Sequence, residues 1–567
     1  MSTMIERKQQ TPTPADHLDR AAAELAAARS KLTATSLTER RQLMEECLDR
    51  LVELAPRWVE AACEAKGIPA GSPLRGEEVA AGVVATARHL RLLIDNYKAV
   101  EREGHIPLPK APFTLPDGSL GVQVMPVKGL FDSLVFAGFV ATAVLGPDVK
   151  KADLEKLGSH LKNLPPAKTV LVLGAGNVSS IPATDAISKI FQEGHVVLLK
   201  MNPVNEYLGP IFQQLFGRLI ELGFLRIIYG GADVGAAAVN HPQVDEVHIT
   251  GSIHSHDAIV WGPAGEERER RKRENDPVLD KPITSELGNV SPWIIVPGPY
   301  SDAQLKFQAE NVAASIANNA SFNCVATKMI VTWKNWPQRQ QFLDYVEEVL
   351  RRVPPRKAYY PGAHERYAKF TGKSPATQPG GELPWTLVRD SDPEKAPVLY
   401  CEESFVCVCA ETALDGANER DFLDKAVEFA NNKLWGTLSA AITVHPSFRK
   451  DPAGAKCFNN ALTNLRHGAV GINHWPALVY AMMSPPWGGY PSGTLADAQS
   501  GIGSVHNTFM LDHVQKTVLE GPLTIWPKPF WFPTHKAPEP IAWKVLELYH
   551  KPSAWKLPGL VLGSLKG

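Results

Sequence analysis

The sequence predicts an α/β protein in which two doubly wound α/β domains form the body of the chain. Beyond residue 165, short runs of β-branched residues alternate with helical stretches. A second set of such runs follows in the C-terminal half. The chain has 567 residues, of which 44% are hydrophobic, enough to fill the cores of roughly two or three domains. Because strands that alternate with helices form parallel crossover units, we expect ligands at the carboxyl ends of the strands.

The N-terminal part of the chain is predicted to be helical. Within 15–98, apolar residues recur at the spacing of one helix face. Ser36 or Thr38 is expected to cap the second helix, because a hydroxyl oxygen there can accept a hydrogen bond from a free backbone N–H.

A connecting region follows these helices. The stretch 105–128 is rich in proline and glycine, which predicts loop and short strand. The apolar run after it, 130–146, is interrupted by Asp132 and by small residues. We therefore predict that this run is buried or lies at an interface.

The two sets of strands are predicted from their β-branched and aliphatic residues. The first set predicts a nucleotide-binding domain, because its strands alternate with helices. Its strands are expected in TVLVLG (169–174), HVVLLK (195–200), LRIIYG (225–230) and EVHITG (246–251). The second set is expected in SPWIIV (291–296), TKMIVTW (327–333), FVCVCAE (405–411), LSAAITV (438–444) and GAVGIN (468–473).

Two further segments stand apart from these domains. The segment 263–281 carries charges of both signs, which predicts a solvated loop or an exposed helix. The alternative is contact with a cofactor phosphate or with a neighbouring subunit. The tail 523–567 holds many aromatic residues, so we expect it to pack on its own chain or on a partner subunit. Contact with a membrane surface is the alternative for this tail.

Charge and cysteine content exclude several classes of protein. Lysine and arginine number 59 against 60 acidic residues, so no overall field attracts nucleic acid or an anionic membrane. The seven cysteines are irregularly spaced, which argues against a disulfide framework and for a reducing compartment, by default the cytoplasm. No stretch has the apolar length of a signal peptide or a membrane span, so neither is expected.

A series of short motifs resembles the aldehyde dehydrogenase superfamily over roughly residues 165–520, in both order and spacing. The motifs are GAGNVSS (174–180), LLKMNP (198–203), ITGSIH (249–254), SELGN (285–289), ASFNCVATK (320–328), EESFVCV (402–408), NNKLWGT (431–437), GAVGIN (468–473) and PPWGGYPSG (485–493). The resemblance implies an NAD(P)-dependent oxidoreductase that acts on a small-molecule aldehyde.

Three residues are expected to carry the chemistry. Cys324 precedes an apolar strand, and a thiolate there can attack an aldehyde carbonyl. The alternative is a small buried hydrophobic residue. The resemblance assigns the general base to Glu286 and the oxyanion donor to Asn177. Without the resemblance, Glu286 would be a capping or surface residue and Asn177 part of a glycine-rich turn.

No metal is expected, because Cys401, Cys407 and Cys409 have no matching histidine pair nearby. The resemblance also implies a dinucleotide site. Its residues are Lys200 for the adenosine ribose, Gly251 and Ser252 for the pyrophosphate, and Glu403 and Phe405 for the nicotinamide ribose and ring. Pro203 occupies a position that is often acidic in NAD-preferring relatives. Loss of that carboxylate removes a repulsion against a 2′-phosphate, so the cofactor is NAD or NADP.

The resemblance further implies a domain division and an oligomer. The division is a dinucleotide-binding domain from 1–117 and 169–285, a small β oligomerisation arm from 118–168 and 494–522, a catalytic domain from 286–493, and the aromatic tail 523–567. A homodimer or homotetramer is expected. The expected reaction is oxidation of an aldehyde to an acid through a cysteine thioester. The alternatives are a CoA-acylating enzyme, in which CoA replaces water, and a non-enzymatic scaffold with the same fold.

Overall fold

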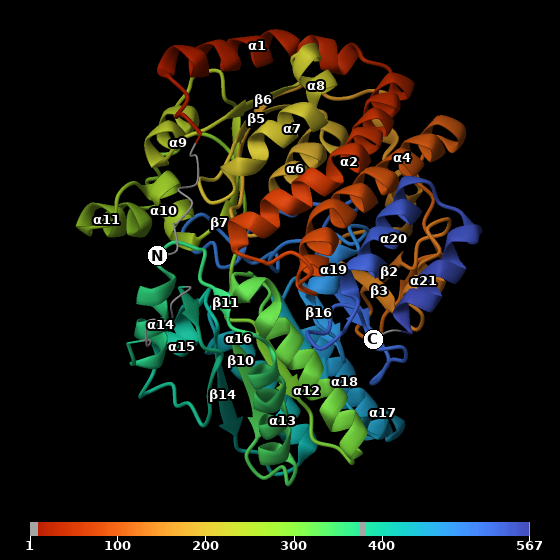
Figure 1. Cartoon of the computed structure of the whole chain (residues 1–567), viewed down its shortest axis with the longest axis vertical. Helices are drawn as coiled ribbons and strands as arrows, with labels where there is room; N and C mark the ends of the chain where they lie inside the picture. Colours follow the sequence, from red (N-terminus) through yellow and green to blue (C-terminus); the bar gives the residue numbers. More distant parts are fainter. Residues whose placement is uncertain (1–9, 375–380, 566–567) are drawn as a thin grey trace.

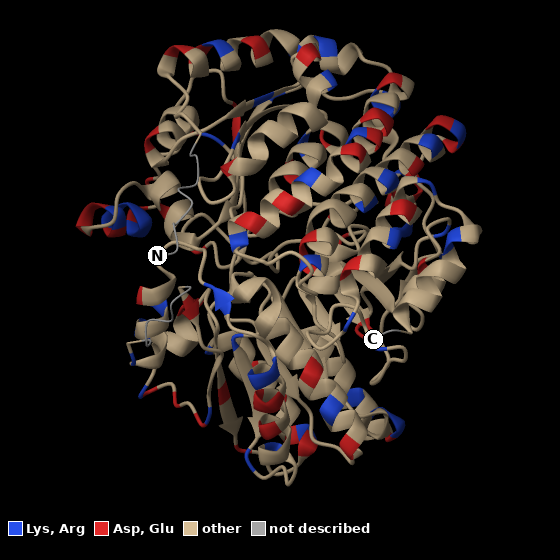
Figure 2. Cartoon of the chain, viewed as in Figure 1, with Lys and Arg blue, Asp and Glu red and all other residues tan. Residues whose placement is uncertain are grey.

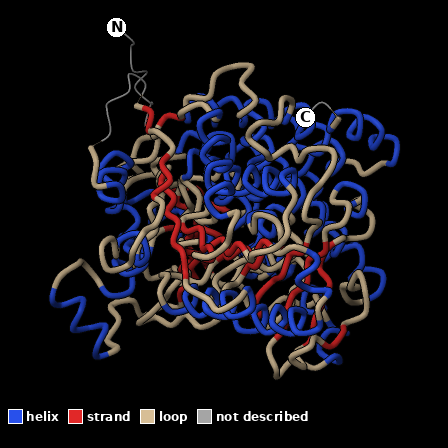
Figure 3. The backbone as a smooth tube through the Cα atoms, turned by 90° about the horizontal axis from the view of Figure 1, so that it is seen from below, coloured by secondary structure: helices blue, strands red, loops and turns tan. Residues whose placement is uncertain are grey.

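The structure is a computed structural model that describes residues 10–374 and 381–565. Residues 1–9 of the predicted dinucleotide domain and 566–567 of the predicted tail lie outside this range. A six-stranded sheet and a ten-stranded sheet form the centre of the molecule, and two further strands form a separate two-stranded sheet. Figure 3 shows the strands inside and the helices around them. The predicted α/β class is confirmed.

Helices form the N-terminal part, as predicted (Figure 1). They are α1 (Ala15–Ala34), α2 (Leu37–Lys66), α3 (Arg75–Glu78), η1 (Val79–Val84) and α4 (Ala85–Glu103). Of the two predicted caps, Ser36 is the one that the structure uses. Its hydroxyl accepts the Glu39 backbone N–H at 3.2 Å, and the Glu39 carboxylate accepts the Ser36 backbone N–H at 2.9 Å.

The six-stranded sheet has the order β17-β8-β7-β4-β5-β6. Its strands are β4 (Thr169–Leu173), β5 (Val196–Lys200), β6 (Leu225–Ile228), β7 (Glu246–Gly251), β8 (Ile283–Leu287) and β17 (Gly501–Ile502). Strands β4 to β8 are parallel, and β17 pairs with β8 antiparallel. The strand order reverses between β4 and β7, which is where ligands bind in doubly wound sheets. All the strands predicted for this domain are present.

Helices connect and cover these strands. They are α6 (Ile181–Ile187), η4 (Ser188–Gln192), η5 (Glu206–Leu208), α7 (Gly209–Leu215), α8 (Gly217–Leu222), α9 (Ala232–Val239), α10 (Ile253–Trp261) and α11 (Glu266–Glu274). Helix α11 has no buried residue and extends away from the body of the molecule, with charges of both signs along it (Figure 2). The segment 263–281 thus contains the exposed helix that its charge pattern predicts.

The ten-stranded sheet has the order β1-β2-β3-β18-β16-β15-β9-β10-β14-β13. Its strands are β1 (Phe113–Thr114), β2 (Leu120–Met125), β3 (Val140–Leu145), β9 (Pro292–Ile295), β10 (Met329–Trp333), β13 (Thr386–Val388), β14 (Val408–Leu414), β15 (Ser439–Thr443), β16 (Ala469–Ile472) and β18 (Val514–Glu520). The seven strands β9, β10, β13, β14, β15, β16 and β18 pair in parallel, whereas β3 pairs with β18 antiparallel. The predicted β arm is therefore continuous with the second α/β sheet of the same chain.

The remaining elements connect these strands or follow them. They are α5 (Asp132–Val135), η2 (Lys151–Lys156), η3 (Ser159–Lys162), α12 (Asp302–Ala317), η6 (Asn318–Ser321), α13 (Arg339–Arg352), β11 (Arg356–Lys357), α14 (Ala363–Thr371), β12 (Glu382–Leu383), α15 (Val398–Cys401), α16 (Glu419–Asn432), α17 (Pro446–Lys450), α18 (Pro452–Asn464), α19 (Ala477–Ala481), α20 (Pro538–His550), η7 (Ala554–Lys556) and α21 (Leu557–Ser564).

Some boundaries differ from the predicted ones. Strand β8 runs across the expected limit between residues 285 and 286, so Glu286 lies on the six-stranded sheet. Strand β14 begins at Val408 rather than at 405, because Phe405 has a left-handed backbone with φ 43° and cannot continue a strand. In the apolar run 130–146, Leu130 is buried, whereas Leu134 is 53% exposed.

The aromatic tail packs on its own chain. Helix α20 buries its apolar face, and the guanidinium of Arg91 donates to the Tyr549 carbonyl at 2.9 Å. Trp526 and Trp555 are exposed, at 83% and 92%. Within the described residues, no helix combines the length and apolar character needed to cross a membrane.

Candidate active site

Cys324 lies on a strained loop between η6 and β10. The three residues Asn319, Ala320 and Ser321 have left-handed backbones, with φ of 52°, 56° and 66°. Such conformations cost roughly 1–3 kcal/mol each outside glycine and persist only where surrounding contacts hold them. Lys328 provides one such contact, because its buried ammonium donates to both the carbonyl and the hydroxyl of Ser321 at 3.0 Å.

Asn319 links this loop to three other parts of the chain. Its side-chain oxygen accepts hydrogen bonds from Lys66 and Tyr359, both at 2.9 Å. Its side-chain nitrogen donates to the carbonyl oxygens of Asn177 at 3.0 Å and Phe322 at 2.8 Å. Lys66 is in turn held by a buried ion pair with Glu78 at 2.8 Å. The backbone around the thiol is therefore fixed from both sides.

Glu286 is the carboxyl group that acts most directly on Cys324. It is 5% exposed and accepts a hydrogen bond from the Trp487 indole N–H at 3.2 Å. Burial raises the pKa of Glu286 to about 8, and the charge of Asp185 adds to this effect. The carboxyl is thus protonated at neutral pH and is poised to exchange a proton near that pH.

The Cys324 thiol is neutral in the free chain. Burial raises its pKa well above the usual value, and the charges of Glu286 and Glu403 raise it further. A hydrogen bond to Glu286 acts in the same direction. A thiolate therefore forms only when a neighbouring base accepts the proton, and Glu286 is the group in position to do so.

Asn177 follows β4, as expected for an oxyanion donor on that strand. Its side chain is 6% exposed, and its amide nitrogen donates to the Phe322 carbonyl at 3.1 Å. An amide nitrogen has two N–H groups, and among the described residues only one of them is engaged. Asn177 lines the same cavity as Cys324 and Glu286, so its second N–H can face a ligand there.

That cavity lies at the switch point of the six-stranded sheet and has a volume of about 480 Å³. Its walls come from the residues after β4 and β7, from β8, and from 401–405. Of the residues predicted from the sequence, it brings together Asn177, Gly251, Ser252, Glu286, Cys324, Glu403 and Phe405.

Gly251 and Ser252 lie where a phosphate is expected. Ser252 is the N-cap of α10, and its hydroxyl accepts the Ser255 backbone N–H at 3.2 Å. Gly251 ends β7 and is exposed. The first turn of this helix thus presents free backbone N–H groups toward the cavity, which favours an anion.

Glu403 and Arg366 give the cavity unpaired polar atoms at its other end. Glu403 lies against Gly288, where a Cβ would approach its Oε2 to 1.9 Å, so any side chain at position 288 would displace this carboxylate. Its Oε1 is buried, and no described residue hydrogen-bonds it; the same holds for Nε and Nη2 of Arg366. An acceptor and donors without partners fit a ligand rich in hydroxyl groups, such as the ribose of a dinucleotide.

Lys200 is placed differently from the other predicted residues. It ends β5 as expected, but it does not line the cavity. It is 8% exposed, and its ammonium lies 3.4 Å from the Met201 carbonyl. Asn202, two residues further on, lines the cavity instead. A ribose contact by Lys200 stays a prediction.

Sequence reasoning missed several residues that shape the site. Asn202 carried a usable signal, since it follows the carboxyl end of a predicted strand. Trp487 lies in the motif PPWGGYPSG, but its role was not predicted. Arg366 and Asn319 carried no signal, because the sequence does not give the spatial pairing of their segments.

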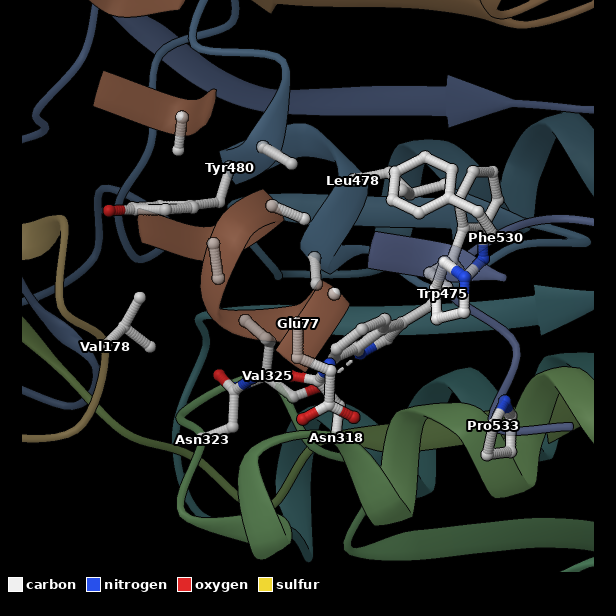
Figure 4. A pocket seen from close by; sticks show the side chains of 18 of the residues that line it. Glu77, Val178, Asn318, Asn323, Val325, Trp475, Leu478, Tyr480, Phe530 and Pro533 are labelled. Carbon is white, nitrogen blue, oxygen red and sulfur yellow. Dashed lines mark hydrogen bonds between the residues drawn. The ribbon is translucent and has the colours of Figure 1, made fainter. Parts of the chain in front are cut away.

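A second cavity meets the first at the thiol. It has a volume of about 140 Å³ and is mainly apolar, with walls from 73–85, 475–487 and 530–538 (Figure 4). Cys324, Glu286 and Ile181 line both cavities. The nucleophile and the carboxyl therefore stand between a cleft suited to a dinucleotide and a pocket suited to an apolar group.

Comparisons with known proteins agree with this geometry. A sequence model of the aldehyde dehydrogenase family matches residues 141–357. The chloroplastic betaine aldehyde dehydrogenase of Atriplex hortensis is 24% identical over 361 residues, which cover 59% of this chain and 64% of that protein. The peroxisomal aminoaldehyde dehydrogenase 1 of Malus domestica is 27% identical over 293 residues, or 47% and 50% of the two chains. The alignments thus span less than two thirds of these relatives.

Solved structures show the same fold. The aldehyde dehydrogenase KauB of Pseudomonas aeruginosa superposes with a TM-score of 0.60 at 17% identity and covers 90% of this chain and 89% of that chain. The AldC aldehyde dehydrogenase of Pseudomonas syringae, solved with NAD+ and octanal, gives a TM-score of 0.59 at 17% identity, with 90% of both chains covered. The predicted resemblance to the aldehyde dehydrogenase superfamily is confirmed by the family model over residues 141–357 and by the fold of the solved structures.

Proposed function

We propose that this chain oxidises an aldehyde to a carboxylic acid with NAD or NADP as the hydride acceptor. The observation that carries the proposal is the position of Cys324 and Glu286, which line both the switch-point cavity and the apolar cavity. A substrate in the apolar cavity and a dinucleotide in the other would meet at this thiol.

The proposed reaction has two stages on this chain. In the first, Glu286 accepts the thiol proton and Cys324 Sγ bonds to the aldehyde carbon. The Asn177 amide and the Cys324 backbone N–H donate to the resulting alkoxide. A bound nicotinamide dinucleotide would supply the hydride acceptor, and loss of hydride from the alkoxide carbon would leave a thioester on Cys324. Glu286 then releases the thiol proton to solvent. In the second stage Glu286 accepts a proton from water, and the water oxygen bonds to the carbonyl carbon. The C–S bond breaks, and the Cys324 thiolate that leaves takes the proton from Glu286.

The dinucleotide would be held by residues at both ends of its cavity. The backbone N–H groups at Ser252 would receive the pyrophosphate, and Glu403 would accept hydroxyls of the nicotinamide ribose. Phe405 would pack near the ring. The absence of a carboxylate at Pro203 leaves room for a 2′-phosphate, so either dinucleotide is a candidate.

The experiment is an aldehyde-dependent assay of NAD(P)H formation with the purified chain. Cys324→Ala should abolish turnover while dinucleotide binding, measured by calorimetry, is retained. Cys457→Ala is a matched control, because Cys457 is a buried thiol on α18 that lines neither cavity. Undiminished turnover in Cys324→Ala would reject the proposal, and an inert thiol with no saturable dinucleotide binding would favour the scaffold alternative.

The acceptor of the acyl group is proposed to be water. A water molecule needs a base more than a thiol does, and Glu286 has its pKa raised to about 8, close to working pH. The same assay with added CoA distinguishes hydrolysis from acylation of CoA, because only the second is accelerated by CoA and yields an acyl thioester.

We also propose a homodimer or homotetramer. The edge strand β1 pairs with β2 of the predicted arm, and its Phe113 is 41% exposed. An apolar edge strand favours pairing with another chain. A cytoplasmic location is the accompanying proposal, supported by seven cysteines that are all free thiols.

A further inference from the structure

We propose that the C-terminal tail docks this chain on an anionic lipid surface. The surface concerned, which we call the tail face, consists of α5, residues 525–531, and the elements α20, η7 and α21. Helix α21 packs beside α20 at one side of the molecule (Figure 1). The inference goes beyond the proposed aldehyde oxidation and does not rest on it.

Exposed apolar side chains are concentrated on the tail face. Among the described residues nine large apolar side chains are exposed, and six of them belong to this face. Trp526 and Trp555 are 83% and 92% exposed, so each offers almost its whole ring to the solvent. The other four are Leu134, Val561, Leu562 and Leu565. Because apolar surface is unfavourable in water, such a cluster marks an interaction surface.

Part of the tail face is hollowed into an apolar groove. Leu134, Trp526 and Val561 line this groove, which has a volume of about 190 Å³. Buried side chains of α20 and α21, such as Ile541 and Leu560, form the rest of its lining. Helix α21 carries no charged residue (Figure 2). Three of the exposed side chains thus belong to one apolar depression.

The charge of the tail fits anionic headgroups. Residues 523–565 contain five lysines against two glutamates, although the whole chain has a net charge of −1. Among the described residues, none that lines the groove is acidic. Of the two glutamates, Glu539 is ion-paired with Arg75 at 3.3 Å. An anionic bilayer would therefore meet a positively charged surface.

Two of these lysines lie against α21. Lys544 donates to the Gly559 carbonyl of this helix at 2.6 Å, and Lys556 is its N-cap residue. The Lys556 ammonium donates to the carbonyl oxygens of Glu547 and Lys551 at 2.7 and 2.8 Å. Both ammonium groups thus bond to backbone carbonyls and keep their charge for an external anion. Lysine and tryptophan beside an apolar helix are side chains that favour the boundary between headgroups and acyl chains.

A second copy of the chain fits the tail face less well. In a two-fold dimer the face would meet itself, so its lysines would approach the lysines of the other copy. Like charges across an interface cost free energy, whereas lipid phosphates supply the opposite charge. The charge of the face therefore favours a lipid surface over a contact between copies.

The tail face lies next to the apolar cavity that contains the thiol. Phe530 and Trp531 line both the groove and that cavity. Figure 4 shows Phe530 on the cavity side, beside Leu478 and Trp475. Docking at the tail face would therefore bring the cavity wall close to molecules that are dissolved in the bilayer.

The first test is sedimentation of the purified full chain with lipid vesicles. Vesicles of phosphatidylcholine alone are compared with vesicles of phosphatidylcholine and phosphatidylglycerol in equal amounts. We expect at least about tenfold tighter binding to the anionic vesicles, since each lysine near such a surface contributes about fivefold. Added salt should weaken this binding, because it screens the charges. Absence of binding to the anionic vesicles would overturn the inference, and so would equal binding to both kinds.

A double variant locates the contact. Trp526→Ser combined with Trp555→Ser removes the two exposed rings, and binding to anionic vesicles should weaken at least about tenfold, since burial of a large aromatic side chain contributes more than this. Val278→Ser is the control, because Val278 is 47% exposed but lies outside the tail face. These side chains are exposed, so thermal unfolding should match that of the wild type. Unchanged vesicle binding in the double variant would contradict the inference.

Two further measurements separate lipid insertion from other contacts. Bromine on acyl chains quenches tryptophan fluorescence at short range, so vesicles with brominated acyl chains should quench part of the fluorescence of the unaltered chain. Bound chain without quenching would overturn the inference, because the rings would then lie outside the acyl region. Analytical ultracentrifugation gives the oligomeric state of the double variant. A smaller oligomer with unchanged vesicle binding would identify the face as a contact between copies and would overturn the inference.

Discussion

Replacement of Glu286 by glutamine tests the base in the second stage of the reaction. The pKa of Glu286 is raised to about 8, so about one carboxyl in ten is ionised at pH 7 and about nine in ten at pH 9. Only the ionised form accepts a proton from water. Hydrolysis of the thioester in the wild-type chain should therefore rise about tenfold between pH 7 and pH 9 and level off above. Glu286→Gln should lose most of this rate and its pH dependence.

Rapid mixing of enzyme, aldehyde and dinucleotide separates the two stages. We expect wild-type enzyme at pH 7 to show a burst of NAD(P)H equal to the enzyme concentration, followed by slow turnover that quickens toward pH 9. In Glu286→Gln both the burst and the steady phase should nearly vanish, because Glu286 accepts the thiol proton in the first stage and a proton from water in the second. The reasoning is refuted if turnover is the same at pH 7 and pH 9, or if Glu286→Gln keeps the wild-type rate.

Two further predictions concern the surroundings of the thiol. Glu403→Gln should raise the KM for the dinucleotide about tenfold or more, since it weakens charge-assisted hydrogen bonds to ribose; an unchanged KM in dinucleotide titrations at saturating aldehyde would contradict this. Asn319→Ala removes the side-chain oxygen that accepts hydrogen bonds from Lys66 and Tyr359. It also replaces a residue type that tolerates a left-handed backbone. The free energy of unfolding should therefore fall by about 3 kcal/mol. Urea denaturation measures this loss of stability. A loss below about 1 kcal/mol would contradict the proposed role of Asn319 in holding the loop.

The parts of the fold that depend on local pattern were predictable from the sequence. The strands β4 to β7 follow from β-branched runs, and Ser36 caps α2 because a hydroxyl and a glutamate stand at the required spacing. The start of β14 was not predictable, since the left-handed backbone of Phe405 depends on its tertiary packing. The apolar run 130–146 was predicted to be buried or to lie at an interface; burial holds at Leu130, whereas an interface at the exposed Leu134 stays a prediction.

The residues of the candidate site also differ in how far the sequence predicted their positions. Cys324, Glu286 and Asn177 lie in motifs with a recognisable neighbourhood, and the structure gathers them at one cavity. Lys200 also lies in a motif that resembles the family, but its side chain does not line the cavity. A sequence motif predicts where a strand ends, but it does not predict the direction in which the side chain at that end points.

The distribution of these residues along the chain explains why the relatives do not determine the substrate. The three proposed catalytic residues lie within 141–357, the region that the family model matches. Most of the wall of the apolar cavity lies outside that region, in 73–85, 475–487 and 530–538. The proposed chemistry of the matched region would thus act beside a pocket whose wall comes mostly from other parts of this chain, including its N-terminal helices and its aromatic tail.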